Sequence, residues 1–321
     1  MRGAEGDAAI SSCRRRLRPM PGDCFAALAM TARAAASFPV DVNVNQPRYS
    51  PERERFAMTD TTILTERRGH ILTVTINRPE ARNAVNAAVH VGIGTALETA
   101  ENDPEIRTVI ITGAGDKSFC AGADLVALSR GESLYPDDPA QQAWGFAGMV
   151  AHPISKPIIA AVNGFAFGGG CEIALMSDII IAADHAQFGL PEVKVGLFAA
   201  AGGAFRLAQQ IPRKLAMEYL LTGDPIPAAR AAEFGLVNHV VPLAELMPTA
   251  IALADKIAAN APLSVQASKR VALGIQDGRI AADAPYWEHN TLERSALMRS
   301  EDAREGPRAF AEKRKPEWKA R

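Results

Sequence analysis

The sequence predicts an α/β fold in which short strands alternate with helices. Two observations support this prediction. From residue 58 onward, short apolar runs that end at glycine or proline alternate with segments of helical spacing. Such alternation is typical of strands that helices cover on both faces. After about Pro242 the strand signals stop and helical spacing continues, so we expect a helical region over residues 243–321.

The individual elements follow from local patterns. Strands are expected at HILTVTINRP (70–79), RTVIITGAG (107–115) and KPIIAAVNG (156–164), and DIIIAADHAQFGLPE (178–192) is expected to give a strand and a turn. The segment 86–104 has apolar residues at helical spacing and ends at Asp103-Pro104. Residues 213–242 predict two helices and a strand. Three further helical stretches are expected at 246–260, 264–278 and 284–314.

Composition limits the classes of function. The chain has 321 residues, of which 48% are hydrophobic and 22% charged, which suits a globular protein with a substantial core. The formal net charge of −1 gives no general electrostatic attraction to nucleic acid or to an anionic membrane. No apolar run approaches the roughly 18 residues that a membrane span requires. We therefore expect neither nucleic acid nor a membrane as a partner.

Four cysteines are scattered along the chain, at Cys13, Cys24, Cys120 and Cys171. They form no CxxC pattern, so we expect no zinc site and no disulfide framework, which fits a reducing compartment. The six histidines form no metal-binding cluster, and no metal is expected.

Residues 1–57 differ from the rest, with the stretch SSCRRRLRP and no sustained helical period. Three interpretations stay open: sequence upstream of a misassigned start at Met58, a disordered tail, or an organelle transit peptide. Acidic residues within this segment count against a transit peptide. We expect a core over residues 58–242. The expected location is the cytoplasm, or the mitochondrial matrix if the segment is a transit peptide.

The stretch GFAFGGGCEIALMSD (164–178) places three glycines before Cys171 and Glu172 at a predicted helix start. Glycine is costly to order, so the triplet needs a reason. It is either a tight strand-to-helix turn or a backbone that approaches a ligand, with N–H groups free at the helix N-terminus. It matches neither the dinucleotide fingerprint nor the P-loop.

Two further segments combine small residues with a carboxylate. SFCAGADL (118–125) follows a predicted strand, and its Asp124 is alone an ordinary helix N-cap. FGLPE (188–192) places Glu192 after a proline turn, where a glutamate is usually solvated or complements a helix dipole. Each segment on its own is weakly informative.

In combination these segments are specific. NRPEARNAVN (77–86), FCAGADL (119–125), GFAFGGGCEIALMSD, and Glu192 twenty residues after Glu172 occur in that order. With this set the chain resembles the crotonase, or enoyl-CoA hydratase/isomerase, superfamily from about residue 62 to 321. The resemblance implies a spiral of repeated ββα units with a helical C-terminal trimerisation region. It also implies an acyl-CoA thioester as substrate and a homotrimer or homohexamer. No cofactor is expected, because coenzyme A is part of the substrate.

The resemblance also implies roles for individual residues. The backbone N–H groups of Ala123 and Gly169 would form an oxyanion hole for the thioester oxygen. Glu172 would orient and deprotonate water, and Glu192 would deliver the proton to C2. Cys120 and Cys171 are expected to pack rather than react.

Coenzyme A would lie along the loop after the first motif and the FCAGADL loop. The expected contacts are Ala81, Arg82, Ala84, Ala121, Gly122, Ala123, Asp124 and Leu125. Lys313 or Lys315 of a neighbouring subunit would reach the phosphates.

The chain leaves the family pattern at LFAAAGGAFRL (197–207), where relatives commonly have a proline and a further glycine. This loop lies near the acyl end of the site in relatives, so the identity of the substrate's acyl chain stays open. The variable segment 126–146 includes Tyr135, Trp144 and Phe146, which would either line the acyl pocket or pack beneath the loop.

The expected activity is that of an enoyl-CoA hydratase, which adds water reversibly to a trans-2-enoyl-CoA. The alternatives are an enoyl-CoA isomerase or a specialised acyl-CoA dehydratase of the same fold. From another class comes a non-catalytic acyl-CoA-binding protein. Retention of both glutamates favours hydration or its reverse.

Overall fold

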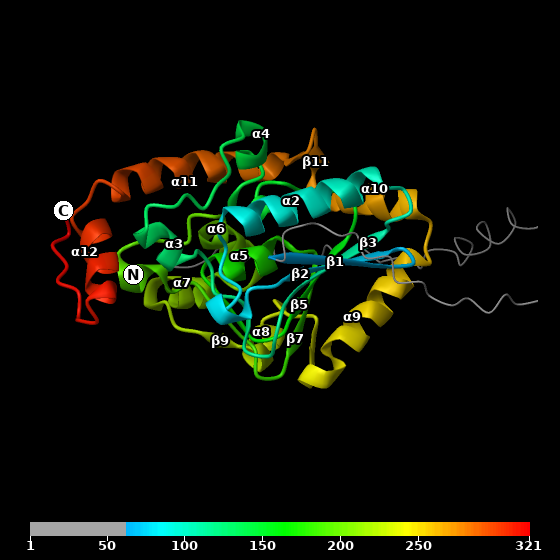
Figure 1. Ribbon diagram of the computed structural model, residues 1–321, viewed down its shortest axis with the longest axis horizontal. Helices are drawn as coiled ribbons and strands as arrows, with labels where there is room; N and C mark the ends of the chain where they lie inside the picture. Colours follow the sequence, from blue (N-terminus) through cyan, green and yellow to red (C-terminus); the bar gives the residue numbers. More distant parts are fainter. Residues whose placement is uncertain (1–61) are drawn as a thin grey trace, which may run out of the picture. The chain divides into compact units, whose positions relative to one another are not determined.

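The computed structural model describes residues 62–321, and all structural statements concern this part of the chain (Figure 1). The three interpretations of residues 1–57 therefore lie outside the described residues. The division at residue 242 stays a prediction.

The strands are β1 (Ile63–Arg68), β2 (Ile71–Ile76), β3 (Thr108–Gly113), β4 (Ser118–Cys120), β5 (Ile158–Val162), β6 (Phe165–Phe167), β7 (Ile179–Ala183), β8 (Gln187–Gly189), β9 (Ile226–Pro227), β10 (His239–Val241), β11 (Ile275–Gln276) and β12 (Arg279–Ile280). The longer helices are α2 (Ala87–Asn102), α5 (Gly169–Met176), α6 (Gly203–Gln210), α7 (Arg213–Thr222), α9 (Leu243–Ala258), α10 (Pro262–Leu273), α11 (Ala284–Leu297) and α12 (Asp302–Ala311). The shorter ones are α3 (Leu125–Ser129), α4 (Pro139–Gln142), α8 (Ala228–Glu233) and the 3-10 turns η1 (Pro79–Ala81), η2 (Phe146–Gly148), η3 (Pro191–Val195) and η4 (Ala281–Asp283).

Two sheets form the core of the fold. The six-stranded sheet has the order β1-β2-β3-β5-β7-β10, and from β2 to β10 all neighbours are parallel. The four-stranded sheet has the order β4-β6-β8-β9, in which β4, β6 and β8 are parallel. The pairs β3–β4, β5–β6 and β7–β8 each contribute one strand to each sheet. This repetition confirms the α/β fold and the repeated units that the resemblance implied.

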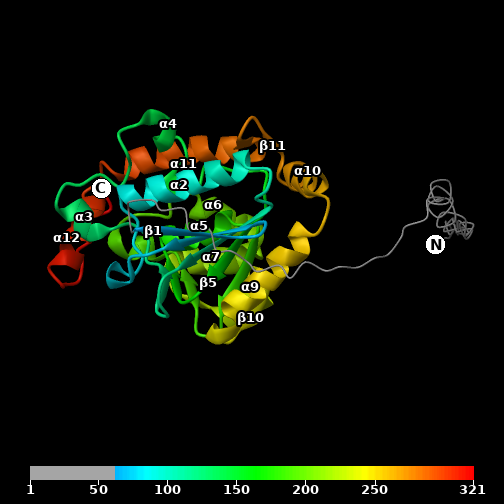
Figure 2. The same ribbon diagram turned by 45° about the vertical axis from the view of Figure 1, so that its right-hand side comes forward.

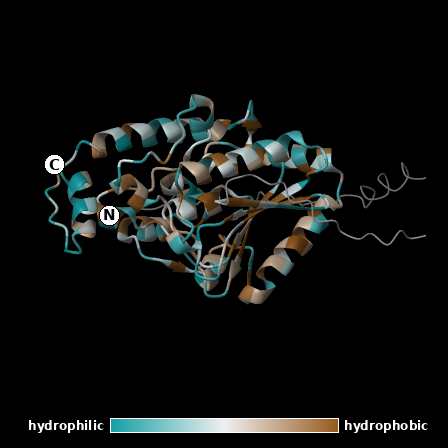
Figure 3. Ribbon diagram, in the orientation of Figure 1, coloured by the Kyte–Doolittle hydropathy of each residue, from teal (hydrophilic) through white to brown (hydrophobic). Residues whose placement is uncertain are grey.

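Helices cover both faces of the six-stranded sheet. One face carries Ile110, Ile159 and Ile181, which form a cluster with Leu246 and Ala250 of α9. The opposite face belongs to the larger core cluster, which includes α2. Figures 1 and 2 show α2 and α9 on opposite sides of the strands. Figure 3 shows the strands largely brown, as buried parallel strands require, whereas α12 is largely teal.

The helical C-terminal region differs in detail from the expectation. The stretch 264–278 is not one helix, because α10 ends at Leu273 with Gly274 in the left-handed conformation and a short hairpin, β11–β12, follows. Glycine adopts that conformation without a steric penalty and so ends the helix. The stretch 284–314 divides into α11 and α12. Within residues 62–321, every helix is too short or too polar to span a membrane.

Substitution of Gly170 tests how tightly α5 packs on β4. A Cβ atom there would lie 2.0 Å from the carbonyl oxygen of Cys120, which belongs to the neighbouring strand β4. Because backbone must move to relieve this contact, we expect Gly170→Ala to lower the free energy of unfolding by about 3 kcal/mol. Urea unfolding measures this loss.

Gly274→Ala is the matched control for this substitution. Its Cβ meets no atom within 4 Å, so only the positive φ opposes the change. The expected loss is about 1 kcal/mol. Equal losses in the two variants would contradict the close packing of α5 on β4.

Candidate active site

The candidate site lies where three parallel strands end. In the four-stranded sheet, β6 pairs with β4 on one side and with β8 on the other, and Phe167 is in register with Gly189. Carboxyl ends of parallel strands meet at one edge of a sheet. The loop of Ala123 follows β4, the glycine triplet follows β6, and Glu192 follows β8. The fold thus brings together the segments that the sequence separates by up to 70 residues.

The backbone around Ala123 has a fixed orientation. Val85 donates to the carbonyl oxygen of Gly122 at 2.8 Å and accepts from the N–H of Asp124 at 2.9 Å. These two bonds place Gly122 O and Asp124 N on the side that faces Val85. In extended backbone the intervening N–H points the other way. The N–H of Ala123 therefore faces away from Val85, and it donates to no other group in the described part of the chain.

Gly169 supplies a second free amide close by. It is the first residue of α5, where an N–H has no partner within its own helix. A Cβ on Gly122 would lie 3.0 Å from the nitrogen of Gly169, so the two loops are in close contact. A Cβ on Gly169 would lie 2.2 Å from the ring of Phe146. The triplet is thus a tight turn and also leaves an amide free at a helix N-terminus, which favours negative charge.

Glu172 lies in the first turn of α5 and is 3% exposed. Its Oε1 accepts hydrogen bonds from the N–H of Ala201 at 2.7 Å and of Gly203 at 2.9 Å. Burial, and then the negative charge of Glu192, raise the pKa of Glu172 to about 8, although these two hydrogen bonds and the charge of Arg206 oppose the rise. A carboxyl group with such a pKa can exchange protons near neutral pH.

Glu192 lies in η3, directly after β8 and Pro191. Its Oε1 is 3.1 Å from the place that a Cβ on Gly168 would occupy, next to the free amide of Gly169. Its Oε2 is buried and has no hydrogen-bond partner among the described residues. Burial raises the pKa of Glu192 to about 7. An unpartnered carboxylate oxygen in such a place is available to a substrate.

The two glutamates are suited to act as an acid–base pair. Burial raises the pKa of both groups toward neutrality, and the charge of Glu192 raises that of Glu172 further, so near neutral pH one group can hold a proton while the other is ionised. One carboxyl group can then donate a proton while the other accepts one. Two free amides lie beside the pair and can bind an oxygen on which negative charge develops. The arrangement suits proton transfer at the carbon next to a thioester carbonyl.

The loops expected to bind coenzyme A also meet. The N–H of Ala121 donates to the carbonyl oxygen of Arg82 at 3.1 Å. Asp124 caps α3 as expected, accepting from Val126 and Ala127. The sequence did not reveal that Arg78 forms an ion pair with Asp124 at 2.8 Å, which ties the two loops together.

The expected contact residues differ in exposure. Arg82, Ala121 and Leu125 are exposed, whereas Ala84, Gly122 and Asp124 are buried. Ala81 and Ala123 are half-buried, and Lys313 and Lys315 are exposed. The role of all of these residues in binding coenzyme A stays a prediction.

The aromatic residues of the variable segment separate into two groups. Phe146 packs on the site glycine, Gly169. Tyr135 is half-buried; burial raises its pKa, against the opposing charge of Arg294, and the charge of Glu172 adds to the rise. Trp144 instead stacks on His152 at a centroid distance of 5.3 Å and packs on α2 at Gly94. The first two can therefore line an acyl pocket, whereas Trp144 packs beneath the loop.

Cys120 and Cys171 are buried free cysteines, as expected of packing residues. Burial raises the pKa of the Cys120 thiol to about 12, which leaves it unreactive near neutral pH. The described residues contain no group of three or more His, Cys, Asp or Glu side chains that could hold a metal ion.

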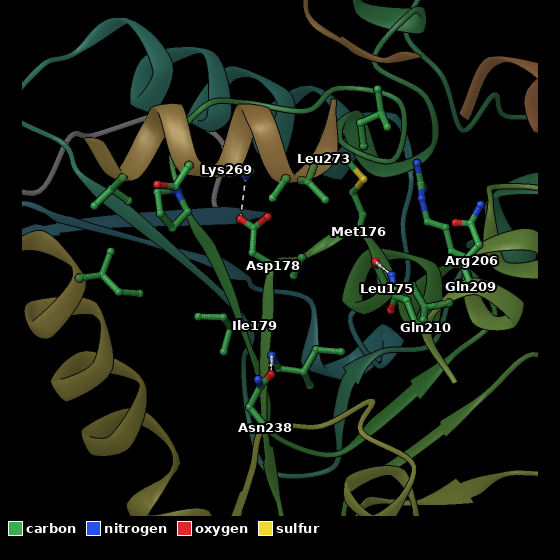
Figure 4. Close-up of a pocket in the computed structure, with 18 of the residues that line it drawn as sticks. Leu175, Met176, Asp178, Ile179, Arg206, Gln209, Gln210, Asn238, Lys269 and Leu273 are labelled. Carbon is green, nitrogen blue, oxygen red and sulfur yellow. Dashed lines mark hydrogen bonds and ion pairs between the residues drawn. The ribbon is translucent and has the colours of Figure 1, made fainter. Parts of the chain in front are cut away.

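A cavity of about 890 Å³ opens elsewhere, behind α5 (Figure 4). It is lined by the Asp178–Lys269 ion pair and by Asn238, among others, and includes neither glutamate of the pair. It is therefore a different feature from the candidate site.

The sequence profile of the enoyl-CoA hydratase/isomerase family matches residues 66–321. The chain therefore belongs to this family, and it is an enzyme of the crotonase type, as the motifs indicated. Individual relatives have more specific names than the family. The carnitinyl-CoA dehydratase of Salmonella arizonae is 44% identical over 264 residues, which cover 82% of this chain and 99% of that protein. That of Proteus mirabilis is 43% identical over 262 residues, 79% of this chain and 97% of that protein.

Solved structures agree with this assignment. The carnitinyl-CoA hydratase of Mycobacterium avium is 59% identical and superposes with a TM-score of 0.79, covering 82% of this chain and all of that one. The enoyl-CoA hydratase of Mycobacterium tuberculosis H37Rv is 42% identical with a TM-score of 0.63 and the same coverage.

The raised pKa of Glu172 predicts a pH-dependent stability. In the native state the carboxyl group keeps its proton up to about pH 8, whereas the ordinary pKa is 4.5. Between these values the native state binds more protons than the unfolded state, so this group makes stability fall as pH rises. Glu172→Gln removes the ionisation. Its free energy of unfolding, relative to wild type, should therefore rise between pH 5 and pH 9 by more than about 1 kcal/mol.

Urea unfolding at the two pH values measures this difference. Glu245→Gln, at an exposed position on α9, is the control and should show no change with pH. A Glu172→Gln variant that loses stability relative to wild type on going from pH 5 to pH 9 would show that the carboxyl group is not held protonated by burial.

Proposed function

We propose that this enzyme catalyses the reversible dehydration of a 3-hydroxyacyl-CoA thioester, with carnitinyl-CoA as its substrate. The observation that carries the proposal is the pair of buried carboxyl groups, Glu172 and Glu192, which share one proton beside two free amides. Neither an isomerase, which needs only one proton-shuttling group, nor a simple acyl-CoA binder requires this pair.

Dehydration removes a proton from C2 and hydroxide from C3. In the proposed mechanism the carboxylate of Glu192 takes the C2 proton, and the electron pair moves toward the thioester oxygen. The N–H groups of Ala123 and Gly169 donate to this oxygen as its charge develops. The enolate electrons then form the C2–C3 double bond while the protonated Glu172 gives its proton to the departing hydroxyl group, which leaves as water. Hydration follows the same steps in reverse, with Glu172 as base and Glu192 as acid.

Two considerations support carnitinyl-CoA. Relatives that are named for this activity match this chain over nearly their whole length. In addition, the carnitinyl group carries a quaternary ammonium on C4, next to the reacting C3. At neutral pH the pair keeps one negative charge in a buried site, where opposite charges attract more strongly than in water. The half-buried ring of Tyr135 offers a further favourable contact for such a cation.

A linear enoyl-CoA is the second candidate substrate, because the 42% identical Mycobacterium tuberculosis protein is an enoyl-CoA hydratase. The proposed chemistry is the same, and only the acyl pocket would differ. Assembly into homotrimers or homohexamers and a cytoplasmic location also stay predictions.

A matched pair of substrates tests the acyl group. In 3-hydroxy-5,5-dimethylhexanoyl-CoA, carbon replaces the ammonium nitrogen of carnitinyl-CoA, so shape is kept and charge is lost. We expect kcat/KM for carnitinyl-CoA to be at least about tenfold higher, equivalent to about 1.4 kcal/mol. The absorbance of the conjugated thioester product follows both reactions. Equal values, with high activity on 3-hydroxybutyryl-CoA, would favour the linear substrate.

Substitution of either glutamate tests the chemistry. Glu172→Gln and Glu192→Gln should each lower kcat by about 10²-fold or more, because proton transfer by a positioned group contributes that much. Binding of coenzyme A thioesters, measured by calorimetry, should change little, and Glu245→Gln should keep full activity. If both site variants turn over at the wild-type rate, the two-glutamate mechanism is wrong.

A further inference from the structure

A buried ion pair lies behind Glu172 and has no role in the mechanism above. Arg206 of α6 is 4% exposed, and its Nη2 donates to Oδ2 of Asp283 at 2.9 Å. Asp283 is also buried and directly precedes α11. Figure 4 shows Arg206 at the wall of the cavity, beside Gln209. Because burial of two charges is costly, such a pair seldom stabilises a fold more than apolar side chains of equal size would. Its presence beside a reacting carboxyl group therefore calls for another reason.

The guanidinium group of Arg206 contacts the loop that holds Glu172. A Cβ on Gly202 would lie 2.7 Å from Nη1 of Arg206, so the guanidinium packs directly on the Gly202 backbone. This Nη1 is buried and has no hydrogen-bond partner among the described residues. The guanidinium group also lies 5.4 Å from the ring centroid of Trp287 on α11. Arg206 is thus confined between α11 and this loop.

The same short loop supplies both hydrogen bonds to Glu172. The donors are the N–H groups of Ala201 and Gly203, which flank Gly202. The carbonyl oxygen of Ala200 accepts from the side chain of Asn290 on α11 at 2.9 Å. One continuous set of contacts therefore runs from α11 through the loop to Oε1 of Glu172, with the charge of Arg206 beside it.

The charged and titratable groups around Glu172 come from several elements. Glu192 of η3 is the opposing negative charge, and Arg206 of α6 is the positive charge. Tyr135 of the variable segment and the thiols of Cys120 and Cys171 are held neutral by burial. Facing Arg206 from the other side is Asp283. Among these groups in the described part of the chain, Arg206 is the cation.

We propose that Arg206 is a positioning residue for Glu172: anchored by Asp283, it packs on Gly202, between the two backbone donors of Glu172, and places a positive charge beside that carboxyl group. This inference rests on the proposed function, since it assigns a part to Arg206 in the same reaction. Without the cation, only the two backbone hydrogen bonds would oppose the burial of Glu172 and the repulsion from Glu192, so Glu172 would hold its proton to higher pH. Arg206 itself does not touch the substrate.

The pH profile of kcat/KM for the full chain tests the proposal. Wild type should give a bell-shaped profile, because the active pair carries one proton, with limbs near pH 7 and pH 8. In Arg206→Gln the alkaline limb should move upward by about one pH unit, since the last proton is then held more tightly. Arg206→Lys keeps the charge, so its limb should stay near that of wild type.

Asp283 variants separate charge from loss of structure. Asp283→Asn removes the ion pair but keeps the cation, so the alkaline limb should not move upward. The double variant Arg206→Gln/Asp283→Asn leaves no unpaired buried charge and is expected to fold even if the single Arg206→Gln variant does not. In the double variant the alkaline limb should also move upward, because its position depends on the positive charge of Arg206 and not on the ion pair.

The outcomes distinguish this inference from the proposed function. If wild type shows no dehydration or hydration activity, the proposed function fails first. If wild type is active with a bell-shaped profile, but the alkaline limb stays in place in both variants that lack the positive charge, Arg206→Gln and Arg206→Gln/Asp283→Asn, the inference is wrong. It is also wrong if Asp283→Asn moves the limb upward as far as Arg206→Gln does, because disruption of the structure would then explain both shifts.

Discussion

The parallel pairing of β4, β6 and β8 is the constraint on which the site depends. Each of these strands is three residues long, and each is followed by a loop that carries one part of the site. Because the strands are adjacent and point the same way, their loops meet at one edge. A shift of one residue between β6 and β8 would separate Glu192 from Gly168 and the free amide of Gly169. The larger sheet, with helices on both faces, holds the small sheet in place through β3, β5 and β7, which precede β4, β6 and β8.

The glycines make this convergence possible at close range. The backbones of the FCAGADL loop and the glycine triplet approach so closely that side chains at Gly122, Gly169 or Gly170 would meet atoms of neighbouring segments. Their loss of backbone freedom on folding is a cost to stability. In the proposed mechanism it is offset in the transition state, where preformed N–H donors stabilise charge without reorganising. The two glutamates have a similar character, since burial of their carboxyl groups opposes ionisation and also places their pKa values where proton transfer is efficient.

Local patterns predicted much of the fold, and the family resemblance predicted the main site residues. The central strands β2, β3, β5 and β7 and the helix at 87–102 are long enough to show a pattern, and the resemblance points to Glu172, Glu192, Ala123 and Gly169. The strands of the small sheet escaped prediction as a separate sheet, because three residues are too few for periodicity. The hairpin after Leu273 was also missed, although Gly274 and the pair Asp277-Gly278 are turn signals that could have revealed it.

The support of Glu172 was not predictable in the same way. Its hydrogen bonds come from backbone N–H groups in the segment 201–203, which depend on conformation and not on side-chain type. The sequence marked this segment as a departure from the family pattern but gave no role for it. The ion pair of Arg206 joins residues 77 positions apart, and a single sequence contains no signal for such a contact.

The central claim is that the free amides and the glutamate pair act on one thioester. A crystal structure of the Glu172→Gln variant with a bound enoyl-CoA tests it most directly. The account predicts the thioester oxygen within about 3 Å of both Ala123 N and Gly169 N. It also predicts C2 facing Glu192 and C3 facing residue 172. A thioester bound away from these two amides, for example in the cavity behind α5, would contradict it.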